Sequence, residues 1–170
     1  MILPPERDLR LTTVRRGGTL TDADHHHLAR WAATCAAHVL PLFEAERPDD
    51  PRPRAALDAL HAWVAGDLPM MRCRAAGGHA MGAARHVSGA PRFAAYAAGQ
   101  AAVVAHVAAH DLGAAAYALK AVRAAAPPGA GEEARRAECR WQREQLPPEV
   151  RALVLDDQRR RNALCWNVFD

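Results

Sequence analysis

Two histidines, His106 and His110, stand four positions apart in a stretch that is mostly alanine and carries no charge between Arg92 and Asp111. Residues four apart share one face of a helix, so the spacing predicts two imidazoles that point the same way. Neutral imidazoles on adjacent turns can ligate zinc or another divalent metal. They can also act as acid–base groups near neutral pH, or join a buried hydrogen-bond network.

A metalloprotease motif would place glutamate directly after the first histidine, but that position holds Val107. A third metal ligand would have to come from elsewhere in the chain, and the candidates are His38, His79, Cys35 and Asp111. We therefore favour a structural polar network and expect no cofactor. A divalent metal such as zinc, held by His106 and His110, is the alternative.

The row of the two histidines continues at steps of three and four through polar or small residues, which are Tyr96, Gly99, Val103, Gly113 and Tyr117. This pattern predicts a helix that is packed closely on most sides and has one polar row inside. The row and the neighbouring predicted helices supply the pocket candidates, which are His38, His79, Arg85, Gln100, His106, His110 and Tyr117. The sequence does not decide whether the histidines are structural or functional.

Cys35 and His38 stand three positions apart and could form a thiolate–imidazolium pair. A cysteine next to Trp31 and Val39 more often packs as a small apolar side chain, and we favour that interpretation. The sequence contains no GxSxG motif, no phosphate-binding glycine loop and no paired carboxylates within an apolar segment. We expect a binding protein rather than an enzyme, although the sequence leaves the question open.

The elements that must position these residues are helices. The chain has 170 residues, enough for one domain with a sizeable core, and half of them are hydrophobic although only 5% are aromatic. Alanine, the best helix former, contributes 40 residues, and strand-forming residues are scarce. We predict an all-α protein with an irregular N-terminal arm over 1–20 and a single compact helical domain over 21–170. This domain should have six or seven helices around a central alanine-rich helix pair over 91–126.

Local signals predict where helices begin and end. A capping box starting at Thr21 predicts a first helix from about residue 22, and Pro41 predicts a kink or stop near Leu40. Asp50 should cap a second helix over about 51–65, and Asp67 should cap a third over about 68–87.

Three further features concern the middle and the end of the chain. The third helix contains Gly77, Gly78 and Gly82, and we expect the backbone of the alanine-rich helix to cross closely there. Asp111 and the glycine two positions later predict a break in the central element near His110. Two charged helices should follow, over about 132–145 and 148–168.

Charge and hydropathy exclude several classes of protein. The formal net charge is +3, from 22 basic and 19 acidic residues, which is too balanced to predict nucleic-acid binding. The longest apolar stretch, 93–110, contains Gln100 and two histidines, so we interpret it as a buried helix and not a membrane span. The N-terminus lacks the layout of a signal peptide, and the four cysteines are dispersed without a CxxC pair. These features predict a cytoplasmic protein with reduced thiols.

Several stretches, taken in their order, resemble a bacterial family of putative immunity proteins over about residues 24–122. They are RWAATCAAHVLPLFE, PDDPRPR, the segment from His79 to Arg85, and AAGQAAVVAHVAAHDLGAAAYALKA. The resemblance implies an all-helical cytoplasmic protein that protects its producer by binding a toxin. It implies no catalytic residues.

Two functions therefore remain. The first is an immunity-type protein that binds a protein toxin and occludes its site through an exposed acidic or apolar patch, with the acidic candidates Glu44, Glu46, Asp49 and Asp50. The alternative is a small enzyme or ligand-binding protein whose pocket contains the histidines, with a divalent metal or acid–base chemistry. Alanine-rich faces also pack on copies of themselves, so the chain could form a homo-oligomer. The sequence identifies neither the toxin nor a substrate.

Overall fold

The computed structural model describes residues 3–4 and 6–170, and all the regular elements in this part of the chain are helical. The predicted all-α fold is therefore confirmed. Seven α-helices are found among the described residues: α1 (Asp22–Glu46), α2 (Arg52–Ala65), α3 (Met70–Ala83), α4 (Gly89–Val103), α5 (Asp111–Ala125), α6 (Gly131–Glu144) and α7 (Pro148–Arg161).

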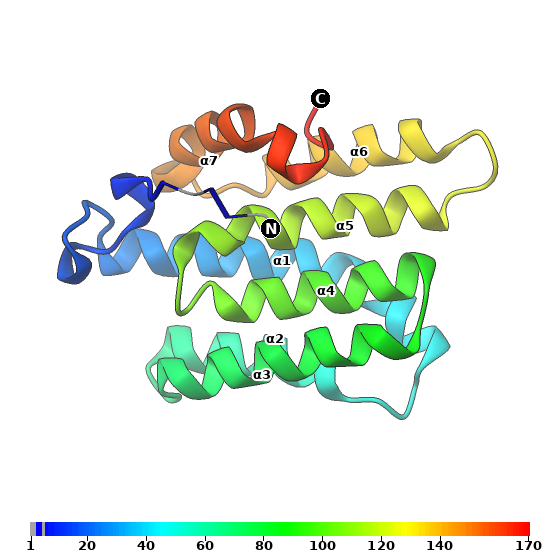
Figure 1. Ribbon diagram of the computed structural model, residues 1–170, viewed down its shortest axis with the longest axis horizontal. Helices are drawn as coiled ribbons and strands as arrows, with labels where there is room; N and C mark the ends of the chain where they lie inside the picture. The colour runs from blue at the N-terminus through cyan, green and yellow to red at the C-terminus, as the bar shows by residue number, and fades with distance from the viewer. Residues whose placement is uncertain (1–2, 5) are drawn as a thin grey trace.

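Helices α1, α4 and α5 form the middle of the molecule, with α2 and α3 along one side and α6 and α7 along the other (Figure 1). Helix α4 contacts α1, α2, α3 and α5, so the alanine-rich segment does lie at the centre. Its alanines are buried almost without exception, and small side chains let four neighbouring helices approach its axis.

Helix α1 begins where the capping box predicts. The side chain of Thr21 accepts a hydrogen bond from the backbone N–H of Asp24, at 3.0 Å. The helix does not stop near Leu40 but continues through Pro41 to Glu46. Pro41 is exposed, while Leu40 and Phe43 on either side of it are buried, so core packing on both sides offsets the lost backbone hydrogen bond.

Helix α2 ends where its local signals predict, but its N-cap is Pro51 rather than the predicted Asp50, and the start of α3 also differs from the prediction. Asp50 Oδ1 accepts from the backbone N–H of Arg52 at 3.2 Å, and Gly66 ends α2 in the left-handed conformation with φ 87°. Helix α3 starts at Met70 rather than near residue 68. The cause is Pro69, because the residue before a proline is disfavoured in the helical conformation.

The glycines of α3 divide into two kinds. A Cβ atom on Gly77 would lie 2.8 Å from the carbonyl oxygen of Gly99 in α4, so the two backbones meet there as predicted. A Cβ on Gly99 would lie 2.4 Å from Met81 Cγ, which makes the close approach reciprocal. A Cβ on Gly78 would meet nothing within 4 Å. The crossing therefore requires Gly77 and Gly99 but not Gly78.

The central segment breaks between α4 and α5, and the first of these two helices ends well before the predicted break near His110. Helix α4 ends at Val103, a turn follows, and the short 3-10 helix η4 (Ala108–His110) leads into α5. The predicted row of Tyr96, His110 and Tyr117 therefore does not lie on one helix. Part of it is re-formed across the α4–α5 hairpin, where the rings of Tyr96 and Tyr117 are 5.0 Å apart.

A buried charge network fastens α7 to this break. Arg161 donates to the carboxylate of Asp157, to the carbonyl oxygen of Ala109 at 2.8 Å, and to Asp111 Oδ1 at 3.5 Å. All three charged side chains are at least 96% buried. Burial raises the pKa of Asp111 to about 7, because the carboxyl is fully enclosed and Asp157 adds a second negative charge.

The N-terminal arm reaches the same end of the molecule. Arg10 pairs with Asp8 at 2.6 Å and with Asp156 of α7 at 2.9 Å, while Arg160 of α7 pairs with Asp8 at 3.1 Å. Leu11 is buried against the domain. The arm is thus held to α7 by a network of ion pairs.

Two sequence expectations concern the chain as a whole. The four cysteines are free thiols and all are buried. In the part of the chain that the structure describes, no helix combines the length and hydropathy needed to span a membrane.

Candidate functional site

His110 lies in the α4–α5 hairpin, and its side chain is hydrogen-bonded to another side chain of the protein. Its Nδ1 lies 2.7 Å from Gln100 Oε1, and Gln100 fills the space that the missing side chain of Gly113 leaves open. Burial lowers the pKa of His110 to about 4, and the positive charge of Arg161 contributes in the same direction. The imidazole is therefore neutral at pH 7 and acts as a hydrogen-bond partner of Gln100.

His106 has different surroundings. Its carbonyl oxygen accepts a hydrogen bond from Arg16 Nη1 at 2.9 Å, and its own Nδ1 is buried without a hydrogen-bond partner among the described residues. Burial lowers the pKa of His106, and the charges of Arg16, Arg74 and Arg7 lower it further. Within residues 3–4 and 6–170 no group of three or more His, Cys, Asp or Glu side chains could hold a metal ion.

His38 belongs to a third environment, next to α6. Its Nδ1 lies 2.9 Å from the buried Glu138 Oε2, and its ring stacks on Trp141 with 3.8 Å between ring centroids. Gln142 donates to the other oxygen of Glu138 at 3.1 Å. Burial raises the pKa of the Cys35 thiol well above its usual value, so this cysteine is an apolar core residue and not a thiolate.

The remaining candidates belong to α3, to the turn after it, and to residues 44–50 at the end of α1. His79 and Arg85 are exposed on or just after α3. We term the segment that contains Glu44, Glu46, Asp49 and Asp50 the acidic turn. Arg54 donates two hydrogen bonds to the carboxylate of Glu44, at 2.7 and 2.8 Å, and Arg52 donates two to that of Asp50, at 2.8 and 2.6 Å.

Glu46 and Asp49 are exposed, and neither is ion-paired within the described residues. The structure thus brings His110 and Gln100 together but distributes the other candidates over separate places.

One group of side chains does converge on the surface. It comprises five residues, which we term the aromatic–lysine cluster: Phe93, Tyr96, Tyr117, Lys120 and Trp166. The Tyr117 ring centroid lies 5.0 Å from that of Tyr96 and 5.1 Å from that of Trp166. Lys120 Nζ lies 3.8 Å from the Trp166 ring centroid and 4.7 Å from that of Phe93, both within the range of a cation–π interaction.

The backbone at the C-terminus turns Trp166 onto this cluster. Trp166 and Asn167 have φ values of 59° and 55°, in the left-handed region that costs a non-glycine residue about 1 kcal/mol or more. Asn162 supports the turn, because its carbonyl accepts from the N–H of Asn167 at 2.8 Å and its Oδ1 accepts from that of Phe169 at 3.0 Å. Trp166 nevertheless remains 44% exposed.

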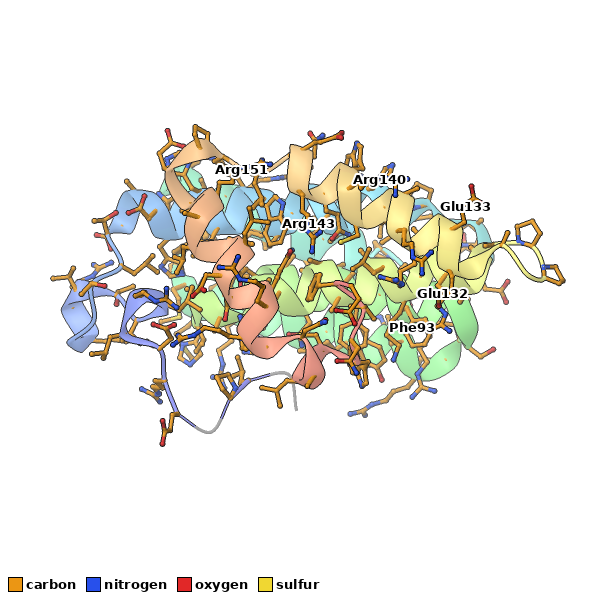
Figure 2. All side chains as sticks on the ribbon, turned by 90° about the horizontal axis from the view of Figure 1, so that it is seen from above. Phe93, Glu132, Glu133, Arg140, Arg143 and Arg151 are labelled. Carbon is orange, nitrogen blue, oxygen red and sulfur yellow. The ribbon has the colours of Figure 1, made fainter. Side chains whose placement is uncertain are left out.

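Sequence reasoning names Tyr96 and Tyr117 of this cluster but misses the other three residues. A local signal existed for the helical members, since Phe93 precedes Tyr96 by three positions and Lys120 follows Tyr117 by three. Phe93 lies toward the end of the molecule where α6 begins, the end that also carries Glu132 (Figure 2). Trp166 gives no such signal, because it reaches the cluster only through the C-terminal turn.

Comparison with known proteins gives one match. A sequence model of the family described as "Imm-5 like putative immunity protein" matches residues 18–149, which is most of the chain. No curated protein matches the chain, and no solved structure matches it. The matched range contains α1 to α6, whereas most of the N-terminal arm and almost all of α7 lie outside it.

Proposed function

Since the chain belongs to the Imm-5 like putative immunity protein family, we propose that it binds a protein toxin and neutralises it without catalysing a reaction. The aromatic–lysine cluster is the surface that makes the contact. It is a partly exposed aromatic surface, in which Trp166 is 44% exposed and the other four side chains are half-buried.

The concentration of aromatic side chains in the cluster supports this assignment. The chain has three phenylalanines, four tryptophans and two tyrosines, and both tyrosines, one tryptophan and one phenylalanine gather here. Binding energy in protein interfaces is concentrated in such residues, with tryptophan, tyrosine and arginine the most frequent contributors. Arg92, whose guanidinium carbon lies 5.7 Å from the Tyr96 ring centroid, extends the patch.

The cluster is also held in place before any partner binds. Lys120 lies over three of the rings, and the C-terminal turn restrains Trp166. Side chains that are already ordered lose little conformational entropy on association, so more of the contact energy appears as affinity.

The acidic turn is a weaker basis for the same function. Arg54 and Arg52 already neutralise Glu44 and Asp50, so only Glu46 and Asp49 would offer free charge to a partner. Exposed single charges affect association rates more than affinity.

The test is a protection assay with the toxin-domain protein encoded next to the gene for this chain. Co-expression should restore growth, and the purified proteins should form a complex. Trp166→Ala or Phe93→Ala should each weaken the complex by about thirtyfold, which corresponds to about 2 kcal/mol for an interface hot spot. The double variant Glu46→Gln/Asp49→Asn is the matched control and should bind as the unmodified protein does.

The outcomes of this assay distinguish toxin binding from the enzyme alternative and locate the contact surface. Absence of a complex with the unmodified protein would refute toxin binding, and a loss confined to the acidic-turn variant would move the contact surface to that turn. The toxin released from the complex should keep its mass and its activity, because occlusion changes no covalent bond. A cleaved or modified toxin would instead support the enzyme alternative.

A further inference from the structure

A cavity of about 1230 Å³ lies between the N-terminal arm, the start of α1, the α4–α5 connection and α7. We term it the arm cavity, and its wall includes Arg7, Arg16, His25, Trp63, His106 and Leu164. It is larger than the 300–1,000 Å³ of a usual small-molecule site. It shares no residue with the aromatic–lysine cluster, so what it binds is independent of the proposed toxin contact.

The arginines that line the arm cavity differ in how they are neutralised. Arg10 and Arg160 are paired with carboxylates of the arm and α7, and Arg161 with Asp157. Arg7 and Arg16, in contrast, form no ion pair with any carboxylate among the described residues. Two guanidinium groups without an ion pair therefore line one cavity, against one carboxylate of the same wall, Glu6, that has no ion pair within the described residues.

His106 lies beside them and has an unused polar atom. Arg16 holds the His106 backbone through the 2.9 Å bond to its carbonyl oxygen, and Nδ1 of the same residue is buried without a hydrogen-bond partner in the described part of the chain. A buried polar atom normally has a partner, and this unpartnered one belongs to a residue that lines the arm cavity. In the tautomer with its proton on Nδ1, a neutral imidazole donates a hydrogen bond.

Apolar side chains form another part of the wall, which also contains the carboxylates of Glu6, Asp8 and Asp157. Trp63 and Met70 come from the ends of α2 and α3, Val107 from the α4–α5 connection, and Leu164 from the C-terminal segment. Trp63 is fixed by edge contacts with His25 and His26, at 5.0 and 4.8 Å between ring centroids. Such a wall suits a flat or aliphatic body attached to the charged group.

We propose that the arm cavity binds an organic anion, in which a carboxylate or phosphate on an apolar ring-sized body meets Arg7, Arg16 and His106. A guanidinium fork pairs with two oxygens of either group, so both kinds of anion share this recognition chemistry. A cation would meet the positive charges of Arg7 and Arg16, and an uncharged body would leave them and His106 Nδ1 without a partner.

Anilinonaphthalene sulfonate is a suitable probe, because it carries an anionic group on an aromatic body, and its uncharged analogue phenylnaphthylamine is the control ligand. Calorimetry with the full chain should show one saturable site for the sulfonate. The affinity should fall with added salt, as expected for a charge-dependent contact. Displacement by naphthyl phosphate and by naphthaleneacetate then distinguishes phosphate from carboxylate as the preferred group.

The double variant Arg7→Gln/Arg16→Gln should weaken sulfonate binding at least about tenfold, which equals about 1.4 kcal/mol. The matched control, Arg85→Gln/Arg140→Gln, removes the same charge from exposed positions and should change the affinity less than about twofold. Arg140 lies on α6, well away from the arm along the length of the molecule (Figure 2). Circular dichroism and thermal melting of each variant verify that the fold is intact.

Binding of phenylnaphthylamine should be weak and equal in both double variants. The proposal is overturned if the unmodified protein has no saturable site for the sulfonate, or if Arg7→Gln/Arg16→Gln binds it as tightly as the unmodified protein. It is equally overturned if the control variant loses as much affinity, because net charge alone would then explain the effect.

Discussion

Replacing the adjacent glycines of α3 by alanine, one at a time, should change stability in opposite directions. Gly77→Ala introduces a Cβ 2.8 Å from the carbonyl oxygen of Gly99 and 2.8 Å from Val103 Cγ1. The oxygen belongs to the α4 backbone and cannot rotate away, so α3 and α4 must separate. Gly78→Ala introduces a Cβ that meets no atom within 4 Å and changes only the intrinsic helix propensity.

The magnitudes follow from two terms. Alanine is favoured over glycine inside a helix by about 1 kcal/mol, and both variants gain this amount. Overpacking a close contact lowers stability by about 1–3 kcal/mol, and only Gly77→Ala carries this cost. We expect Gly78→Ala to be more stable than the unmodified protein by up to about 1 kcal/mol. Gly77→Ala should be less stable than Gly78→Ala by about 1–3 kcal/mol, because the gain in helix propensity is the same in both variants and only the cost of overpacking differs.

Urea unfolding followed by circular dichroism at 222 nm measures both free energies on the same scale. The difference between the two variants should also appear as a lower melting temperature of Gly77→Ala, by about 2–4 °C for each kcal/mol in a chain of this size. Equal stability of the two variants, or a more stable Gly77→Ala, would show that the helices do not cross at this residue.

Two further predictions concern buried charge. The pKa of His110 is about 4 in the folded protein and 6.5 in an unfolded chain, so this group lowers stability as pH drops from 6.5 to 4, by about 1 kcal/mol per pH unit. The raised pKa of Asp111 acts in the opposite direction over the same range, so the contribution of His110 is measured as a difference. Between pH 7 and pH 5 the unmodified protein should lose stability relative to His110→Ala in urea unfolding, and the same pH dependence in both would contradict the assignment. Arg161→Met should cost about 3–5 kcal/mol, because two buried carboxylates lose their counter-ion. Arg159→Met on the same helix breaks only an exposed pair and should cost less than about 1 kcal/mol, and thermal melting of the two variants decides between these values.

Features encoded within one helical turn could be predicted from the sequence. The cap at Thr21 and the termination at Gly66 depend on groups only a few positions apart in the chain. The glycines of α3 also indicated a close crossing with the alanine-rich helix, since only small residues let two backbones touch. Pro41 was misleading, because burial of Phe43 on the far side of the proline keeps the helix intact.

The candidate site was less accessible to such reasoning. The spacing of His106 and His110 would place them on one face only if the helix continued through both, and the turn after Val103 gives each residue its own surroundings. His110 meets Gln100 across the hairpin, and His106 meets Arg16 of the arm. Neither partner lies within one turn of its histidine, so no local periodicity could identify it.

The sequence by itself determined the all-α class, the central place of the alanine-rich segment and most helix boundaries, because propensity, capping and small side chains act between near neighbours. Only the tertiary structure decided which distant groups meet. Lys120 Nζ lies over the ring of Trp166, which is 46 positions further along the chain, and Arg10 pairs with Asp156 at a separation of 146 residues. Such contacts depend on the angle and register at which helices pack, and these are fixed by the whole core rather than by any one stretch of residues.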